Sequence, residues 1–105
     1  MNEISVSELA RRHDAGENFL LLDVREPDEI ATASIPWASV IPMGEIPERV
    51  AELPADKPIY ALCRSGARSG RVTAFLNQNG YPDAANVVGG ILAWAKEIDP
   101  SVPTY

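Results

Sequence analysis

One cysteine and the six residues that follow it form the segment of this sequence best suited to chemistry. Cys63 opens Cys63-Arg64-Ser65-Gly66-Ala67-Arg68-Ser69, directly after an apolar run and directly before a helical pattern. The start of a helix presents free backbone N–H groups and the positive end of the helix dipole. Gly66 allows a close backbone approach, and Arg64 and Arg68 add two positive charges. A thiol in such surroundings ionises below its free pKa of roughly 8.5, so the segment predicts a reactive, anion-binding cysteine.

The elements that would position Cys63 alternate between strands and helices. Short apolar runs predict strands at Phe19–Val24, Ser39–Ile41, Ile59–Leu62 and Asn86–Val88. Helical patterns begin at Ser7, a plausible N-cap, and at Pro27, and they cover Pro47–Leu53, Ala67–Gln78 and Ile91–Ile98. This alternation implies right-handed crossovers, and therefore an α/β fold with a mostly parallel sheet and helices on both faces. Chemistry in such folds lies at the carboxyl ends of strands, here just after Leu62 and just after Val24. The tail from Asp99 to Tyr105 is predicted to be an extended terminus.

Length and composition limit the classes of function. The chain has 105 residues, which predicts a single domain over residues 1–105, and its net charge of −6 argues against nucleic acid or anionic lipid as a partner. Met1–Ser5 has no basic start, and no apolar run is long enough to span a membrane. One cysteine and one histidine can form neither a disulfide nor the usual zinc site. We therefore expect a cytoplasmic protein without a metal.

Three segments of the sequence resemble the rhodanese family in the order in which that family carries them. Leu22-Asp23-Val24-Arg25-Glu26 is similar to its opening "DVRE" motif, and residues 63–69 are similar to its active-site loop. Val88-Gly89-Gly90-Ile91-Leu92-Ala93-Trp94 is similar to its closing "GG…W" signature. The chain departs from the family at Ala33-Ser34-Ile35-Pro36-Trp37-Ala38 and at Val40. These departures fall in a connection, so they affect the partner contacts expected there and leave the loop intact.

The resemblance implies a role for each matching residue. Cys63 would carry sulfur as a persulfide, and the backbone amides of Arg64, Ser65, Gly66, Ala67, Arg68 and Ser69 would hold it. Asp23 and Arg25 would brace this loop from the neighbouring strand end, and Gly89 with Gly90 would mark a tight turn. The sheet would have five strands.

The resulting expectation is a sulfurtransferase without a cofactor. It would take sulfane sulfur from a small anionic donor such as thiosulfate, or from a persulfide donor protein, and pass it to a thiol or to cyanide. A non-catalytic binding or redox-sensing module of the same fold is the first alternative. An arsenate-reductase-like or phosphatase-like enzyme is the second, but four residues separate Cys63 from Arg68 and the phosphatase pattern has five.

Other chemically capable residues are better explained by structure. His13, the only histidine, lies late in the first helical pattern, where a positive charge meets the helix dipole favourably. Glu26, Asp28 and Glu29 stand where negative charge stabilises a first helical turn. Trp94 is predicted to be a core residue. Trp37 is left open between the core and a partner contact.

Overall fold

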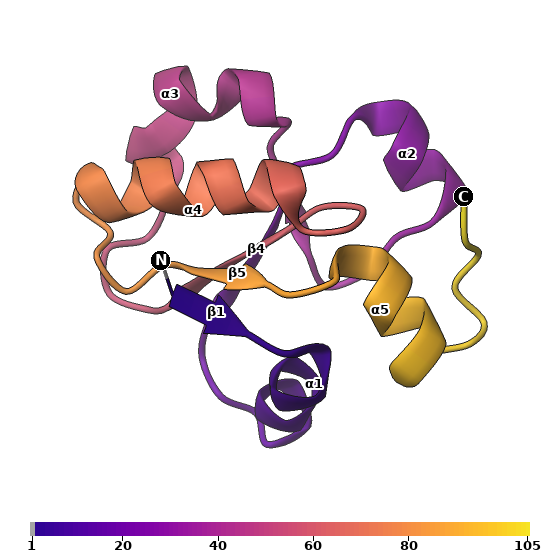
Figure 1. The fold of residues 1–105 in the computed structure, drawn as a ribbon. Helices are drawn as coiled ribbons and strands as arrows, with labels where there is room; N and C mark the ends of the chain where they lie inside the picture. Colours follow the sequence, from indigo (N-terminus) through magenta and orange to yellow (C-terminus); the bar gives the residue numbers. More distant parts are fainter. Residues whose placement is uncertain (1) are drawn as a thin grey trace.

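Five parallel strands form the central layer of the structure, a computed structural model that describes residues 2–105 (Figure 1). Met1, the first residue of the predicted domain, lies outside the described residues. The strands lie in the order β1-β5-β4-β2-β3, and each neighbouring pair is parallel. Their bounds are Asn2–Ile4 for β1, Leu20–Asp23 for β2, Ser39–Val40 for β3, Ile59–Leu62 for β4 and Ala85–Val87 for β5. The predicted fold class is confirmed.

The strand β1 has no counterpart among the apolar runs of the sequence. Only Ile4 of its three residues is buried, so the segment carries no run of apolar residues. It becomes a strand because β5 offers a free edge, along which Asn2 pairs with Ala85 and Ile4 with Val87. Long-range pairing therefore decides this element.

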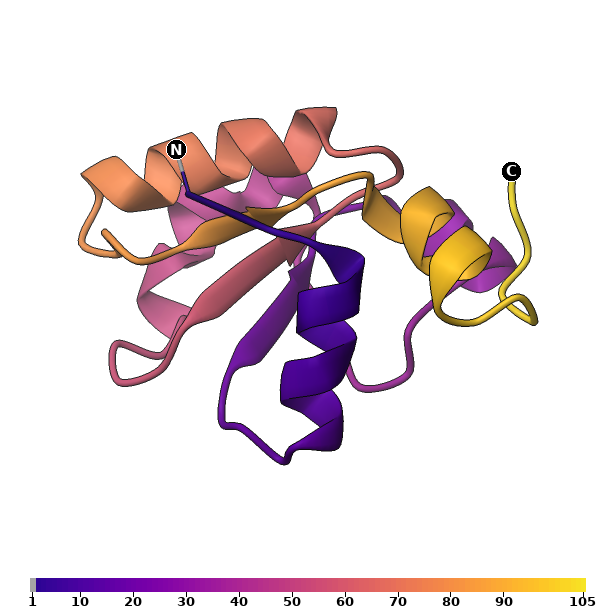
Figure 2. The ribbon, with the colours of Figure 1, turned by 60° about the horizontal axis from the view of Figure 1, so that its bottom comes forward.

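Helices cover both faces of the sheet (Figures 1 and 2). On one face, Leu9 of α1 (Val6–Asp14) and Ile91 of α5 (Gly90–Glu97) pack on a core cluster that includes Leu21. On the other face, Ile46 of α3 (Ile46–Arg49) and Leu76 of α4 (Ala67–Gln78) pack on a second cluster that includes Leu22 and Cys63. Successive strand residues alternate between the two clusters, because side chains of a strand point to opposite faces.

Three helix starts differ from the sequence prediction, among them that of α5, which begins at Gly90 and not at Ile91. Ser5, and not Ser7, is the N-cap of α1, because its side-chain oxygen accepts a hydrogen bond of 3.1 Å from the backbone N–H of Glu8. The helix predicted over Pro47–Leu53 is shorter and more broken. Only α3, which begins at Ile46, is an α-helix there. The 3₁₀ turn η1 (Met43–Glu45) precedes it, and the 3₁₀ turn η2 (Val50–Glu52) follows it. The helix α2 (Pro27–Thr32) begins at Pro27 as predicted.

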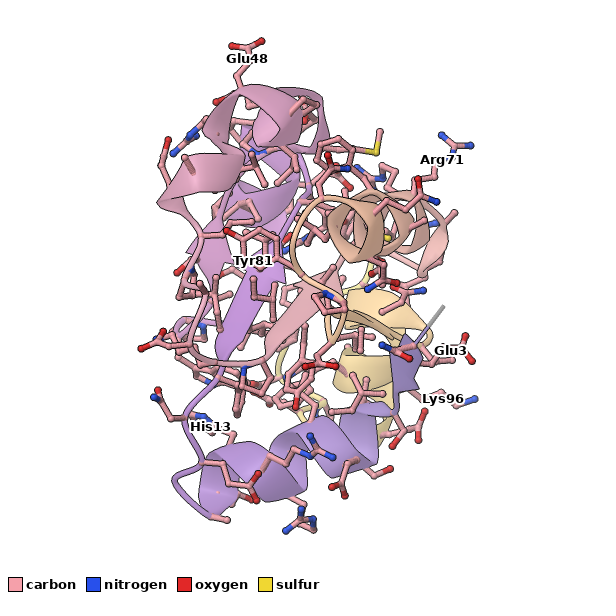
Figure 3. The ribbon with its side chains drawn as sticks, turned by 90° about the vertical axis from the view of Figure 1, so that its left-hand side faces the viewer. Glu3, His13, Glu48, Arg71, Tyr81 and Lys96 are labelled. Carbon is pink, nitrogen blue, oxygen red and sulfur yellow. The ribbon has the colours of Figure 1, made fainter. Side chains whose placement is uncertain are left out.

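The last residues of the chain pack onto the domain. Val102 and Tyr105 pack against the first core cluster, so the tail is not the simple extended terminus that was predicted. Charged side chains point away from the ribbon on several elements, among them Glu3, Glu48, Arg71 and Lys96 (Figure 3). Within residues 2–105, no helix combines the length and the apolar character needed to cross a membrane.

Candidate active site

Cys63 lies where β4 ends and α4 is about to begin, at the carboxyl end of the sheet. Its side chain is almost fully buried, with 1% of its surface exposed. The sulfur accepts hydrogen bonds from the backbone N–H of Gly66 at 3.1 Å and from the hydroxyl of Ser69 at 3.2 Å. Gly66 has a φ of +114°, a conformation that side chains disfavour, and this lets its N–H turn back toward the sulfur. Residues 63–69, named the Cys63 loop below, therefore surround the sulfur with donors.

These donors set the ionisation of Cys63. Burial raises the pKa of the thiol, but hydrogen bonds from the Ser69 hydroxyl and from the backbone N–H groups of Ser69, Gly66 and Ser65 lower it. The net result is a pKa below the ordinary value of a cysteine. A lowered pKa was predicted from the N–H groups at the helix start and from the two arginines, and the hydrogen bonds to the sulfur come from those N–H groups and from the Ser69 hydroxyl. Hydrogen bonds to the charged form of the sulfur produce the shift.

The start of α5 holds the Cys63 loop from behind. The backbone N–H of Ile91 donates to the Cys63 carbonyl at 2.9 Å, and that of Leu92 donates to the Arg64 carbonyl at 3.2 Å. Gly89 and Gly90 have φ of +79° and +60°, which forms the turn into α5. A Cβ on Gly90 would lie 2.5 Å from the Cys63 oxygen and 2.6 Å from the Arg64 carbonyl carbon. The loop carbonyls are thereby bound to α5, which leaves the loop N–H groups for the sulfur.

Asp23 and Arg25 form a buried ion pair after β2. Arg25 Nη2 lies 2.7 Å from Asp23 Oδ2, and the two side chains are 0% and 1% exposed. The same guanidinium donates to the Ala33 carbonyl at 2.8 Å and to the Tyr105 hydroxyl at 2.9 Å. The pair therefore holds the end of α2 and the tail directly. Its connection to the Cys63 loop is indirect, because Tyr105 accepts from Arg64 and Glu29 accepts from Arg68.

Both arginines of the Cys63 loop have partners within the chain. Arg68 forms two hydrogen bonds with the carboxylate of Glu29, at 2.6 and 2.8 Å. This arginine is the main reason why the pKa of Glu29 is lowered to about 2. Arg64 donates from Nε to the main-chain oxygen of Tyr105 at 2.6 Å, and its Nη2 donates to the same oxygen. Its guanidinium also lies 5.2 Å from the centre of the Tyr105 ring.

Three residues at this site were not predicted to belong to it. Glu29 binds Arg68, Tyr105 bridges Arg25 and Glu29 through its hydroxyl, and Asn86 of β5 accepts a 2.6 Å hydrogen bond from Ser69. Glu29 was assigned to helix capping, which it also performs, because its side chain accepts from the backbone N–H of Glu26. No local sequence signal marks Asn86 or Tyr105, since their partners lie far away along the chain.

The remaining sequence candidates lie elsewhere. His13, the next-to-last residue of α1 (Figure 3), stacks on Trp37 with 3.8 Å between ring centroids, so its ring contacts an aromatic side chain. Trp37 also contacts Trp94 edge-on at 5.8 Å and packs on the first core cluster, so it is partly a core residue. Among residues 2–105, no three His, Cys, Asp or Glu side chains converge into a group that could hold a metal ion.

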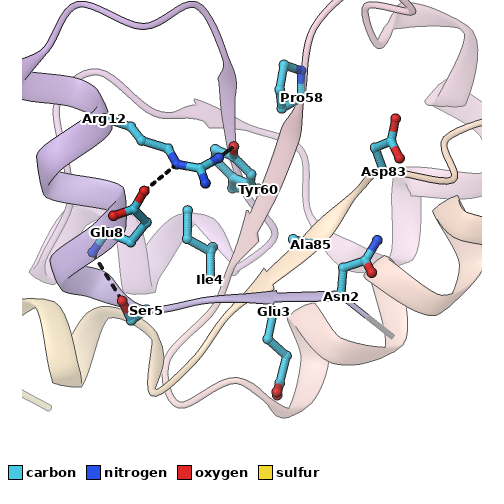
Figure 4. Close-up of a pocket in the computed structure, with 10 residues that line it drawn as sticks. All are labelled: Asn2, Glu3, Ile4, Ser5, Glu8, Arg12, Pro58, Tyr60, Asp83 and Ala85. Atoms are coloured by element: carbon cyan, nitrogen blue, oxygen red, sulfur yellow. Dashed lines mark hydrogen bonds and ion pairs between the residues drawn. The ribbon is translucent and has the colours of Figure 1, made fainter.

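A groove of about 450 Å³ lies beside β1 and α1, where Asn2, Ser5, Glu8, Arg12 and Tyr60 contribute to its walls (Figure 4). Arg12 crosses it, donating to Glu8 at 2.9 Å and to the Tyr60 hydroxyl. The Cys63 loop does not line this groove.

Known proteins are similar to this chain in sequence and in fold. The family model described as rhodanese-like domain matches residues 5–97. A sulfurtransferase of Allochromatium vinosum is 45% identical over 102 residues, which cover 97% of this chain and 95% of that protein. A putative sulfurtransferase of Bacillus subtilis is 42% identical over 100 residues, covering 95% and 96% of the two chains. The crystal structure of a rhodanese-like domain protein from Staphylococcus aureus superposes with a TM-score of 0.86 at 33% identity, covering 100% of this chain and 99% of that one. The chain belongs to the family of rhodanese-like domains.

Proposed function

We propose that this protein is a sulfurtransferase that carries sulfane sulfur as a persulfide on Cys63. The observation that supports this most directly is the set of donors aimed at one buried sulfur, the N–H of Gly66 and the hydroxyl of Ser69. Such donors stabilise negative charge on sulfur, both on the attacking thiolate and on a bound persulfide. Two relatives that match almost the whole chain are named as sulfurtransferases, one of them as putative.

In the first half-reaction the Cys63 thiolate attacks the outer sulfur of a donor such as thiosulfate. The new S–S bond forms as the S–S bond of thiosulfate breaks, and sulfite leaves with the electron pair of that bond. In the second half-reaction an acceptor, cyanide or a thiolate, attacks the outer sulfur of the persulfide. Cys63 leaves as a thiolate, so the two half-reactions return the enzyme to its starting state and ping-pong kinetics follow. A donor protein that carries a persulfide would serve in the same way, with its own thiolate leaving.

The phosphatase-like alternative fits the site less well. An oxyanion in the loop would need the Arg68 guanidinium as a ligand. Nη1 and Nη2 of Arg68 already donate to the carboxylate of Glu29. Experiment distinguishes the binding-module alternative from the sulfurtransferase, because a module that only docks a partner would not accept sulfur.

Intact-mass measurement after incubation with thiosulfate tests the proposal. We expect the wild-type protein to gain one sulfur atom and to lose it again when cyanide is added. Cys63→Ser should gain none and show no thiosulfate:cyanide activity, because Cys63 is the only cysteine of the chain. Its circular dichroism spectrum should match that of the wild type. A folded wild-type protein that never gains sulfur from thiosulfate or from a persulfide donor would refute the proposal.

A further inference from the structure

Asn86 connects two parts of the Cys63 loop without touching the sulfur. Its side-chain oxygen Oδ1 lies 2.6 Å from the hydroxyl oxygen of Ser69, and its Nδ2 donates to the Gly66 carbonyl at 3.1 Å. Ser69 and Gly66 are the two residues whose groups donate to the Cys63 sulfur. Asn86 is 6% exposed and Ser69 is fully buried, so water does not substitute for these contacts.

The orientation of the Asn86 amide follows from its neighbours. The Gly66 carbonyl can only accept a hydrogen bond, so the NH₂ group of the amide must face it. The oxygen Oδ1 then faces Ser69 and can only accept. Both Oδ1 of Asn86 and the sulfur of Cys63 are thus acceptors next to one hydroxyl group.

The hydroxyl of Ser69 has a single hydrogen for these two acceptors. When Cys63 is a thiol, its S–H can donate to the Ser69 oxygen while the Ser69 O–H donates to Asn86, and all three groups are satisfied. When Cys63 is a thiolate, it has no hydrogen to give and needs the Ser69 hydrogen for itself. The hydroxyl must then turn from Asn86 to the sulfur, because a charged acceptor binds a donor more strongly than an amide oxygen does.

We propose that Asn86 is a positioning residue that holds the Ser69 hydroxyl and releases it to the Cys63 sulfur as the sulfur becomes charged. The proposal rests on the proposed function in one respect only, which is the step of sulfur transfer at which the hydroxyl turns. In a persulfide the negative charge moves to the outer sulfur, and the inner sulfur becomes a weak acceptor. The hydroxyl then returns to Asn86, so Asn86 favours the loaded state over the free thiolate.

The charged groups around Cys63 make no hydrogen bond to Ser69 or Asn86. Arg68 of α4 is bound to Glu29 of α2, Arg64 of the Cys63 loop is bound to Tyr105, and Asp23 is bound to Arg25 after β2. On the α5 side, backbone N–H groups and not side chains bind the Cys63 and Arg64 carbonyls. Substitution of Asn86 or Ser69 leaves all three charged contacts in place.

A double-mutant cycle on the Cys63 pKa, measured as the pH dependence of iodoacetamide alkylation, tests the proposal. The four proteins are wild type, Asn86→Ala, Ser69→Ala and the double variant. Removing Asn86 frees the Ser69 hydroxyl to donate to the thiolate. That hydrogen bond lowers the Cys63 pKa, and it can form only while Ser69 is present. We expect the shift caused by Asn86→Ala to be more negative when Ser69 is present than in the Ser69→Ala background, by about half to one pH unit for one hydrogen bond. Equal shifts in the two backgrounds would overturn the proposal, because a purely structural role does not depend on the hydroxyl.

A measurement on the unsubstituted protein covers the case in which Asn86→Ala does not fold. The side-chain amide signals of Asn86, followed by NMR, should titrate together with Cys63, and this change should shrink in Ser69→Ala. Asn77 provides the matched control, since it is an asparagine whose amide binds the carbonyls of Tyr81, Pro82 and Ala84 away from the sulfur. An Asn86 signal that stays constant through the Cys63 titration would overturn the proposal. Neither readout uses a sulfur donor, so a failure here is distinct from a failure of sulfur loading.

Discussion

The site has a side made of backbone N–H groups, the main-chain side, and a side made of three arginines and their partners, the charged side. The two sides hold the Cys63 sulfur and its surroundings in different ways. On the main-chain side, the Gly66 N–H contacts the sulfur, and the N–H groups of α5 bind the loop carbonyls behind it. On the charged side, Arg25, Arg68 and Arg64 bind Asp23, Glu29 and Tyr105 and make no hydrogen bond to the sulfur. The backbone N–H groups therefore hold the sulfur and its loop, while the arginine contacts hold the segments that surround them. Breaking the two sides separately tests this division.

On the main-chain side, the largest effect is expected from Gly90→Ala. The new Cβ would lie within 2.6 Å of the Arg64 carbonyl carbon, at a residue with a φ of +60°. The loop or α5 must move, and we expect a loss of more than about 2 kcal/mol in the free energy of unfolding, since the left-handed conformation alone costs roughly 1–2 kcal/mol. Urea denaturation measures the stability, and sulfur loading should fall with it.

Gly80→Ala is the matched control for that variant. Gly80 also has a positive φ, of +96°, but nothing lies within 4 Å of the position of its Cβ. It should lose stability through backbone strain while Cys63 alkylation stays unchanged. Equal loss of sulfur loading in both variants would mean that the contact between α5 and the loop has no role.

On the charged side, Asp23→Ala is expected to affect stability most. It leaves the Arg25 guanidinium, which is 0% exposed, without its carboxylate, and breaking such a buried pair costs about 3–5 kcal/mol. The denaturation midpoint should fall strongly, whereas Glu52→Ala, which breaks an exposed pair with Arg49, should shift it little. A midpoint near that of the wild type would show that the buried pair does not brace the site.

The smallest effect is expected from the pair of Arg68 with Glu29. Because Glu29 already neutralises Arg68, Arg68→Ala should raise the Cys63 pKa by less than the roughly 1–3 units typical of a close opposite charge. Glu29→Gln frees the arginine and should instead lower the Cys63 pKa, which the pH dependence of alkylation will show. Shifts of the same sign in the two variants would contradict the division between the two sides.

Much of the chain that holds Cys63 was predictable from the sequence. The strand Ile59–Leu62 and the helix Ala67–Gln78 have the predicted bounds, because the first is a continuous apolar run and the second ends before Gly80. The position of the N-cap at Ser5 was missed by two residues, since two serines stand at the start of α1 and only geometry chooses between them.

The contacts across the site were not predictable in the same way. Arg68 meets Glu29, which is 39 residues away, and Ser69 meets Asn86, which is 17 residues away. Tyr105 reaches Arg25 across 80 residues. Such pairs depend on which loops the crossovers bring to one edge of the sheet. The activation of Cys63 by the arginines stays a prediction, and the partners that share their charge could not be read from the sequence because they are distant along it.

The hydrogen bonds from Ile91 and Leu92 to the Cys63 and Arg64 carbonyls also have a consequence for dynamics. Two segments joined by mutual backbone bonds tend to open together as one cooperative unit. The first turn of α5 cannot fray without releasing the carbonyls of the Cys63 loop, and the loop cannot rearrange without exposing those two amides. Exchange of the Ile91 and Leu92 amide hydrogens with solvent therefore reports how often the sulfur-holding loop opens, although neither residue touches the sulfur.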